Sequence, residues 1–303
     1  MKKWLAVTWG ILTAGFITFF GLYSSNRLLY MKKKEEEDII KRESMANRLS
    51  LADFNTLPKE EVTIPSPFGY DLHTYFIHPY NSKRYVVFCH GVTETKWNSI
   101  KYMNIFLKRG FNAVIYDHRR HGQSGGKTTS FGHYEKHDLK AVIEELRRRI
   151  GEDAFIGIHG ESMGAATMLL YAGGLKDCAD FYIADCSFSD FQAQFLYRFK
   201  MDTKVNGKWL LPITNLFLKY RGGFTFKEVS PLSVMRNISK PILFIHSQDD
   251  DFILPIMTKA LFQQKTGDKM LYIADKGAHA QSYNENPEQY ERVIDEFLTT
   301  YLM

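Results

Sequence analysis

The sequence predicts an α/β fold in which a mostly parallel, twisted sheet carries helices on both faces. Short apolar runs rich in β-branched and aromatic residues alternate with segments whose apolar residues recur three and four positions apart. One serine, with a glycine two residues away on each side, stands between such a run and such a segment. Strands that alternate with helices form a parallel sheet covered on both sides.

The N-terminal segment predicts a membrane anchor at residues 1–30. No charged side chain occurs between residues 4 and 23, and Lys2 and Lys3 precede this stretch. About 20 apolar residues cross the ~30 Å hydrocarbon core of a bilayer. A cleaved signal peptide is the alternative, although residues 22–26 offer no small-x-small cleavage site. Basic residues flank both ends, and we expect a single-pass anchor in the cell membrane with the following domain outside the cytoplasm.

A charged segment at residues 31–60 predicts a spacer. Its lysines are followed by glutamates, a pattern typical of an amphipathic helix or a flexible linker. We expect the spacer to hold the following domain, residues 61–303, near the bilayer. That domain is long enough for one large core, and no internal repeat or low-complexity tract divides it.

The strand and helix patterns continue through this domain. An opening antiparallel hairpin at the sheet edge is expected at residues 62–64 and 72–78. The other expected strands include residues 85–89, 155–158, 181–185, 241–246 and 269–273. The expected helices include residues 97–109, 133–150, 255–264 and 287–301.

The segment around Ser162 predicts a nucleophile elbow. Residues 160–164 read Gly-Glu-Ser-Met-Gly, directly between an expected strand and a helix that begins with small residues. Such a turn strains the serine backbone and lifts its hydroxyl above the sheet. The unpaired N–H groups of the following helix can receive the negative charge that develops on a carbonyl oxygen under attack. We therefore identify Ser162 as a candidate nucleophile.

An aromatic insertion at about residues 188–228 predicts a helical cap over the site. The interval between the expected strands that end at residue 185 and begin at residue 241 is too long for an ordinary connection. Its many phenylalanine, tyrosine and tryptophan residues favour packed helices over a free loop. Helices on the flank that never touch substrate are the alternative.

Candidate partners for the serine follow later in the chain. A hydroxyl becomes a good nucleophile only when a base takes its proton, so a histidine and a carboxylate are required. His279 lies in a small-residue loop after the last expected strand. The carboxylate is expected among residues 249–251, three aspartates that follow the strand at 241–246. The chain order serine, acid, histidine is the order that this arrangement of strands demands.

Two backbone N–H groups are candidates for an oxyanion hole. Met163 supplies one at the start of the helix, and Val92 supplies the other after the His-Gly turn at residues 90–91. Thr93 is an alternative donor through its backbone or its hydroxyl.

The combined motifs resemble the α/β-hydrolase superfamily from about residue 61 to the C-terminus, and they are most similar to its membrane-anchored bacterial members. Residues 117–124 resemble the family's D-x-R-G-x-G-x-S loop, with Arg120 where glycine is usual. In relatives the acid lies four residues after the histidine that ends its strand, so the resemblance implies Asp250. Asp251 is the alternative, because its spacing also suits some members.

The resemblance implies a serine hydrolase that cleaves a carboxylic ester or thioester of a small or acyl-chain substrate. Two alternatives are a serine peptidase similar to prolyl oligopeptidase and an inactive hydrolase fold that serves as a membrane-tethered binding protein. The complete serine, acid and histidine set argues against the second. We also expect a chain beginning near Leu51 to be soluble and to hydrolyse short esters at nearly the full rate.

The composition excludes other functions. The formal net charge of +5 is modest, and no basic stripe or nucleic-acid-binding module is present. Three cysteines do not make a disulfide framework. The pairs His118 with His121 and His133 with His137 have ligand-like spacing, but neither belongs to a metal motif. We expect no metal and no cofactor, and the oligomeric state is open.

Overall fold

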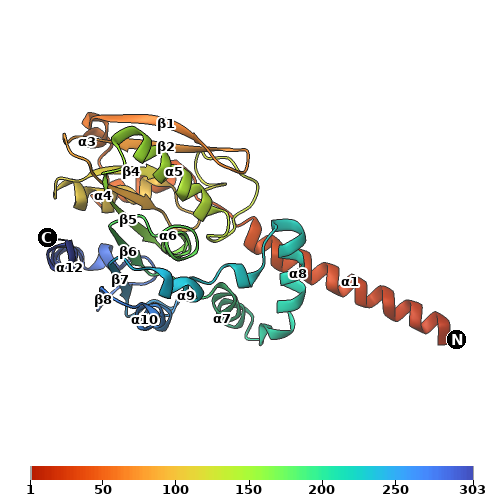
Figure 1. Ribbon diagram of the computed structural model, residues 1–303. Helices are drawn as coiled ribbons and strands as arrows, with labels where there is room; N and C mark the ends of the chain where they lie inside the picture. Colours follow the sequence, from red (N-terminus) through yellow and green to blue (C-terminus); the bar gives the residue numbers. More distant parts are fainter. Residues whose placement is uncertain (1, 303) are drawn as a thin grey trace.

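A single eight-stranded sheet with helices on both faces organises the protein (Figure 1). The computed structural model describes residues 2–302. The strand order is β1-β2-β4-β3-β5-β6-β7-β8; β2 runs antiparallel to both β1 and β4, and every other neighbouring pair is parallel. This arrangement confirms the predicted α/β-hydrolase fold, including the opening hairpin. The strands are β1 (Lys59–Pro65), β2 (Asp71–Ile77), β3 (Arg84–Cys89), β4 (Asn112–Tyr116), β5 (Phe155–Glu161), β6 (Phe181–Asp185), β7 (Ile242–Ser247) and β8 (Lys269–Ala274).

Alternation along the strands builds a hydrophobic core on each face of the sheet. In β3, for example, Val87 and Cys89 belong to one core, while Val86 and Phe88 belong to the other. The first core is covered by α5 (Glu135–Ile150), α6 (Met163–Gly174), α9 (Pro231–Val234) and α10 (Pro255–Gln264). The second is covered by α4 (Ile100–Leu107) and α12 (Pro287–Leu302). Short segments complete the body: η1 (Lys96–Ser99), η4 (Met235–Asn237) and α11 (Ser282–Glu285).

The aromatic insertion is helical, as expected. It consists of α7 (Phe191–Thr203), η2 (Gly207–Trp209), α8 (Leu211–Gly222) and η3 (Phe226–Glu228). The Asp190 side chain caps α7 by accepting a hydrogen bond from the backbone N–H of Ala193. The phenylalanines of the insertion, together with Met163 of α6, form a third hydrophobic cluster at the end of the sheet where Ser162 lies. The insertion therefore covers the candidate site.

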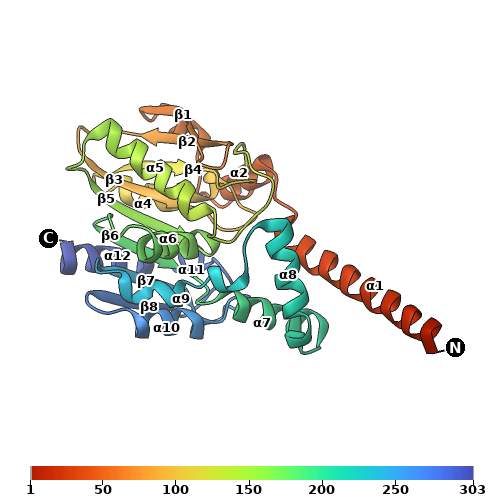
Figure 2. The same cartoon turned by 45° about the vertical axis from the view of Figure 1, so that its right-hand side comes forward.

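Helix α1 (Lys2–Leu29) is long and apolar enough to cross a membrane, a property that signal sequences share. Figures 1 and 2 show that its C-terminal part crosses α8 while its N-terminal part extends beyond the rest of the molecule. Only the residues near the crossing are buried, and these are Gly21, Ser24, Ser25 and Leu29.

The charged segment after α1 differs from a free spacer. It forms α2 (Glu36–Met45) and α3 (Leu51–Thr56), so the helical expectation is the one that the structure follows. Isolated apolar residues between the charges, among them Ile39 and Leu49, are buried against the body. Arg42 pairs with Glu94 at 2.8 Å, and Glu36 pairs at 3.0 Å with the buried Lys96. The sequence did not reveal this packing, because the few apolar residues among the charges, such as the pair Ile39 and Ile40, are too few to show a period.

Removal of residues 1–50 is therefore expected to destabilise the protein, whereas the sequence alone predicts a soluble and nearly fully active chain starting near Leu51. Leu29, Ile39 and Leu49 are buried, and burial of each aliphatic side chain stabilises by about 1.5–3 kcal/mol. We expect the melting temperature to fall by about 10 °C or more relative to the full chain in the same detergent. Deletion of residues 2–20, which are mostly exposed, is the matched control and should leave the melting temperature nearly unchanged. Equal melting temperatures for the two deletions would restore the spacer interpretation.

Candidate active site

The turn between β5 and α6 has the strained geometry of a nucleophile elbow. Ser162 adopts φ 55° and ψ −114°, a region that side-chain-bearing residues rarely occupy. Only glycine fits at the two flanking positions, because backbone atoms lie where a Cβ would be. A Cβ at Gly160 would lie 2.6 Å from the Ala165 backbone, and one at Gly164 would lie 2.0 Å from the Cys89 carbonyl oxygen. The turn brings β3, β5 and α6 close together and holds the serine hydroxyl at the end of the sheet.

Gly164→Ala is expected to disrupt this turn. The added Cβ meets backbone atoms that cannot rotate away, so the free energy of unfolding should fall by about 3 kcal/mol or more. Gly174→Ala, at the other end of the same helix, is the matched control because its Cβ would lie 3.8 Å from the nearest heavy atom. Urea unfolding should show the control unchanged or slightly stabilised. A Gly164→Ala protein as stable as the wild type would contradict the tight-elbow interpretation.

Ser162, His279 and Asp250 form a continuous chain of hydrogen bonds. Ser162 Oγ lies 2.8 Å from His279 Nε2, and His279 Nδ1 lies 2.7 Å from Asp250 Oδ2. Because an ionised carboxylate only accepts hydrogen bonds, Nδ1 carries the ring hydrogen and Nε2 is free to accept the serine proton. The structure thus brings together the three side chains that the sequence singled out from three separate loops.

The carboxylate of Asp250 is held by further donors. The backbone N–H groups of Phe252 and Ile253 each donate to Asp250 Oδ1 at 2.9 Å, and His246 Nε2 lies 3.0 Å from Oδ2. Burial raises the pKa of this carboxyl, but the hydrogen bonds from His246 and His279 outweigh it and hold the pKa well below its ordinary value. Asp251 is exposed, and its carbonyl oxygen accepts a hydrogen bond from Tyr197. The geometry therefore favours Asp250 over Asp251.

The two candidate oxyanion donors are unengaged within residues 2–302: neither the N–H of Val92 nor that of Met163 has an acceptor there. The backbone N–H of the alternative donor Thr93 is occupied, because it donates to His121 Nε2 at 3.1 Å; the Thr93 hydroxyl stays an alternative. His90 fixes the same loop by donating from Nδ1 to the Gly91 carbonyl oxygen at 2.7 Å. Burial lowers the pKa of His90 to about 4, so this ring is neutral and serves as a loop support.

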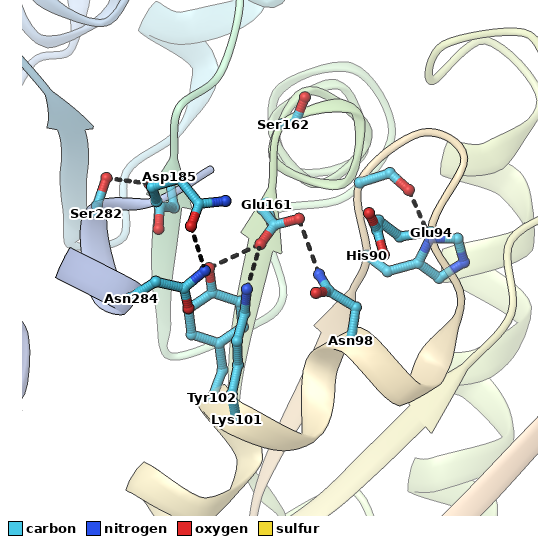
Figure 3. A network of polar contacts seen from close by, with 12 residues as sticks. His90, Glu94, Asn98, Lys101, Tyr102, Glu161, Ser162, Asp185, Ser282 and Asn284 are labelled. Carbon is cyan, nitrogen blue, oxygen red and sulfur yellow. Dashed lines mark hydrogen bonds and ion pairs between the residues drawn. The ribbon is translucent and has the colours of Figure 1, made fainter. Parts of the chain in front are cut away.

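A buried polar network lies beneath the elbow (Figure 3). Glu161 accepts hydrogen bonds from Asn98 at 3.0 Å and from Tyr102 at 2.7 Å, and Lys101 Nζ is 3.4 Å from its carboxylate. Nearby, burial and then the charge of Glu161 raise the pKa of Asp185 to about 7. The network fixes the residue that immediately precedes Ser162.

Two cavities meet at Ser162. The first, of about 500 Å³, is mainly apolar and is lined by α6, α7 and the end of α1. The second, of about 460 Å³, is lined by more charged and polar side chains, which include His279, three glutamates and several basic residues. Phe252 lines both and lies against His279, with ring centroids 5.0 Å apart. Within residues 2–302, no three His, Cys, Asp or Glu side chains converge as a metal site.

Several lining residues escaped sequence reasoning. No motif marks Phe252, next to the candidate acid, or Glu161, inside the elbow, as a residue that lines the cavity. The contribution of α1 was also missed, because its apolar composition predicts lipid contact rather than a cavity wall. A small signal was present: Ser24 and Ser25 are polar residues at the end of an apolar helix.

Known proteins support the same fold. Residues 80–199 match the family model described as serine aminopeptidase, S33. An esterase of Pyrococcus furiosus, Pf2001, superposes with a TM-score of 0.68 at 22% identity, covering 84% of this chain and 97% of its own. An acylaminoacyl peptidase of Pyrococcus horikoshii superposes with a TM-score of 0.61 at 20% identity, covering 83% of this chain and 43% of its own. At these identities the solved structures show the fold, and together with the family model they support a hydrolase.

A nearly full-length relative gives the family. The uncharacterized protein YqkD of Bacillus subtilis (strain 168) is 48% identical over 299 residues, which cover 98% of this chain and 97% of YqkD. Similarity of this extent includes the N-terminal helix, the elbow and the cap. The chain therefore belongs to the same family as YqkD, and its fold is that of the α/β hydrolases.

Proposed function

We propose that this protein is a serine hydrolase that cleaves carboxylic ester or thioester bonds through an acyl-enzyme. The observation that carries the proposal is the hydrogen-bond chain from Ser162 through His279 to Asp250, beside two cavities that share the serine hydroxyl. A nucleophile, a base and an orienting acid in this order suffice for acyl transfer without a cofactor.

The proposed reaction begins when Ser162 Oγ attacks the substrate carbonyl carbon. His279 Nε2 takes the serine proton, and the N–H groups of Val92 and Met163 stabilise the oxyanion. The ester C–O or thioester C–S bond then breaks, and His279 returns the proton to the departing alcohol or thiol. Water, deprotonated by the same histidine, attacks the acyl-enzyme and releases the carboxylic acid.

The membrane location is also a proposal. We assign α1 as an uncleaved anchor, because its last turns pack against the cap and a cleaved signal sequence would leave that surface uncovered. We also propose that the body lies on the extracytoplasmic side, with Lys2 and Lys3 inside, against the competing basic residues Arg27, Lys32, Lys33 and Lys34 at the other end of α1.

A peptidase activity is the second candidate. The family model that matches residues 80–199 is described as a serine aminopeptidase. The same three side chains could cleave an amide, since the proton that His279 carries is what an amine leaving group requires. Ester hydrolysis is preferred because the first cavity is mainly apolar and suits an acyl chain.

A fluorophosphonate probe tests the proposal directly. We expect the full chain to be labelled at Ser162, as located by peptide mass spectrometry, and to hydrolyse p-nitrophenyl esters. A parallel assay with aminoacyl-naphthylamides distinguishes a peptidase from an esterase, because only a peptidase cleaves their amide bond. A folded protein that neither reacts with the probe nor hydrolyses either substrate class would identify an inactive binding protein instead.

A further inference from the structure

The end of α1 forms a wall of the larger cavity beside Ser162. Tyr23, Ser24, Arg27 and Leu28 line it from α1, opposite the phenylalanines of α7. The volume of about 500 Å³ lies within the range of small-molecule sites. A helix that served only as a tether would not need to line this cavity.

The wall is held in place by close packing between α1 and α8. Gly21 allows the contact, because a Cβ there would lie 2.3 Å from the Phe217 ring. The Thr214 hydroxyl donates to Ser24 Oγ at 2.8 Å, and Arg221 donates to Ser25 Oγ at 2.7 Å. These contacts fix the rotation of α1 about its axis, so the same side of the helix always faces the cavity.

The tip of the cap lies beside the apolar stretch of α1. The Trp209 ring is 5.7 Å from that of Phe16 and 5.1 Å from that of Phe20, centroid to centroid, and both phenylalanines lie within the stretch that would span the bilayer. Large apolar side chains are exposed on the same insertion: Met201, Val205, Trp209, Leu216 and Tyr220. Exposed aromatic and aliphatic residues interspersed with lysines are typical of surfaces that rest in the interfacial layer of a membrane.

Between α1 and α7 the lining of the cavity reaches the protein surface, because the side chains of Arg27 and Asp202 are 59% and 35% exposed. Arg27 of α1 and Asp202 of α7 both line the cavity, and their charged groups approach to 3.6 Å. Tyr23, at the end of the apolar stretch, lines the cavity beside them. A mouth at the end of a membrane-spanning stretch faces the boundary between lipid and water.

We infer that the substrate is a membrane-resident lipid ester, whose long acyl chain enters the apolar cavity from the bilayer between α1 and α7. Its carbonyl would reach Ser162, and its polar head would occupy the second cavity, whose lining includes Asn284 and an ion-pair cluster of Lys34 and Arg42 with Glu94. The inference rests on the proposed hydrolase function. Attack transfers the acyl group to Ser162 Oγ and releases the head as an alcohol, and water then releases the fatty acid.

The first test narrows the cavity by enlarging a side chain of α1 that lines it. In the full chain, Leu28→Trp should lower kcat/KM for a 16-carbon acyl ester by about tenfold or more, because misfit in an apolar pocket costs about 1–3 kcal/mol. The ratio of kcat/KM for the 16-carbon ester to kcat/KM for the acetate ester of the same alcohol should fall by a similar factor, because only the longer acyl group fills the cavity. Leu22→Trp is the matched control, because Leu22 is exposed on the same helix and does not line the cavity.

The outcomes separate this inference from the proposed function. An unchanged chain-length profile in Leu28→Trp would overturn the assignment of α1 as a cavity wall. An equal loss of kcat/KM on both esters would also overturn it, because it would indicate a merely structural role. Leu28→Ala repeats the comparison without added bulk. The acetate ester and labelling of Ser162 in the wild type test the hydrolase proposal alone.

The second test asks where the substrate comes from. Full-length protein in phosphatidylglycerol vesicles is mixed with a palmitoyl ester placed either in the same vesicles or in separate ones. Initial rates over the first seconds should be at least about tenfold higher in the same vesicles, before the ester passes through water. Equal rates in the two arrangements would show uptake from water and overturn delivery from the bilayer.

Discussion

Ser162→Ala is expected to abolish ester hydrolysis and fluorophosphonate labelling. The substitution removes the atom that forms the acyl-enzyme, and the remaining oxyanion donors and cavities cannot provide a covalent path. In other hydrolases of this type, loss of the nucleophile lowers kcat by about 10⁶. The melting temperature should change little, since alanine fits the elbow and only one hydroxyl is lost.

Ser189→Ala is the matched control for this experiment. Ser189 is a buried serine close to the cap, and its side chain makes no hydrogen bond to the described residues. It should keep wild-type turnover and labelling. Activity of Ser162→Ala within tenfold of the wild type would remove Ser162 from the proposed mechanism.

Asp250→Asn should lower turnover by about 10⁴, by analogy with the same change in other serine hydrolases. An amide in place of the carboxylate can donate to His279 Nδ1, which then favours the ring tautomer with hydrogen on Nε2. That tautomer cannot accept the proton of Ser162. The substitution also removes the negative charge that stabilises the protonated ring.

Asp251→Asn decides the register between the neighbouring aspartates. Asp251 is exposed, so its replacement should leave kcat/KM within about twofold of the wild type. Damage from Asp251→Asn together with a mild effect of Asp250→Asn would move the acid by one residue and refute our assignment. Circular dichroism on both variants excludes a general loss of folding as the cause.

The sheet and the elbow were predictable because they depend on local patterns. Residues 155–158 form a continuous apolar run, and the Gly-x-Ser-x-Gly spacing around Ser162 is a short motif that is visible within five residues of the sequence. The hairpin of β1 and β2 was predictable for the same reason, since a proline- and glycine-rich turn separates two short apolar stretches. The order of Ser162, the aspartates and His279 followed from chain direction in a parallel sheet.

The remaining parts of the site depend on contacts between distant segments. The packing of α1 on α8 pairs residues about two hundred positions apart, such as Ser24 with Thr214, whose hydrogen bond spans 190 positions. Gly21 is ordinary in an apolar helix and becomes informative only when Phe217 lies against it. Likewise, Glu161 gains its partners from η1 and α4, and no periodicity in these segments indicates that pairing. Tertiary packing of this kind leaves little trace in a single sequence.

The close packing between α1 and α8 changes how such an enzyme would encounter its substrate. A protein on a flexible tether tumbles above the membrane, and only a fraction of its encounters present the right face. Here the buried Gly21 contact and the two serine hydrogen bonds fix the body to the anchor, so every copy would hold its cavity mouth at one height and one tilt. With the proposed membrane-resident ester, the search for substrate would be two-dimensional, and turnover would follow the mole fraction of the ester within the membrane rather than its concentration in the surrounding water.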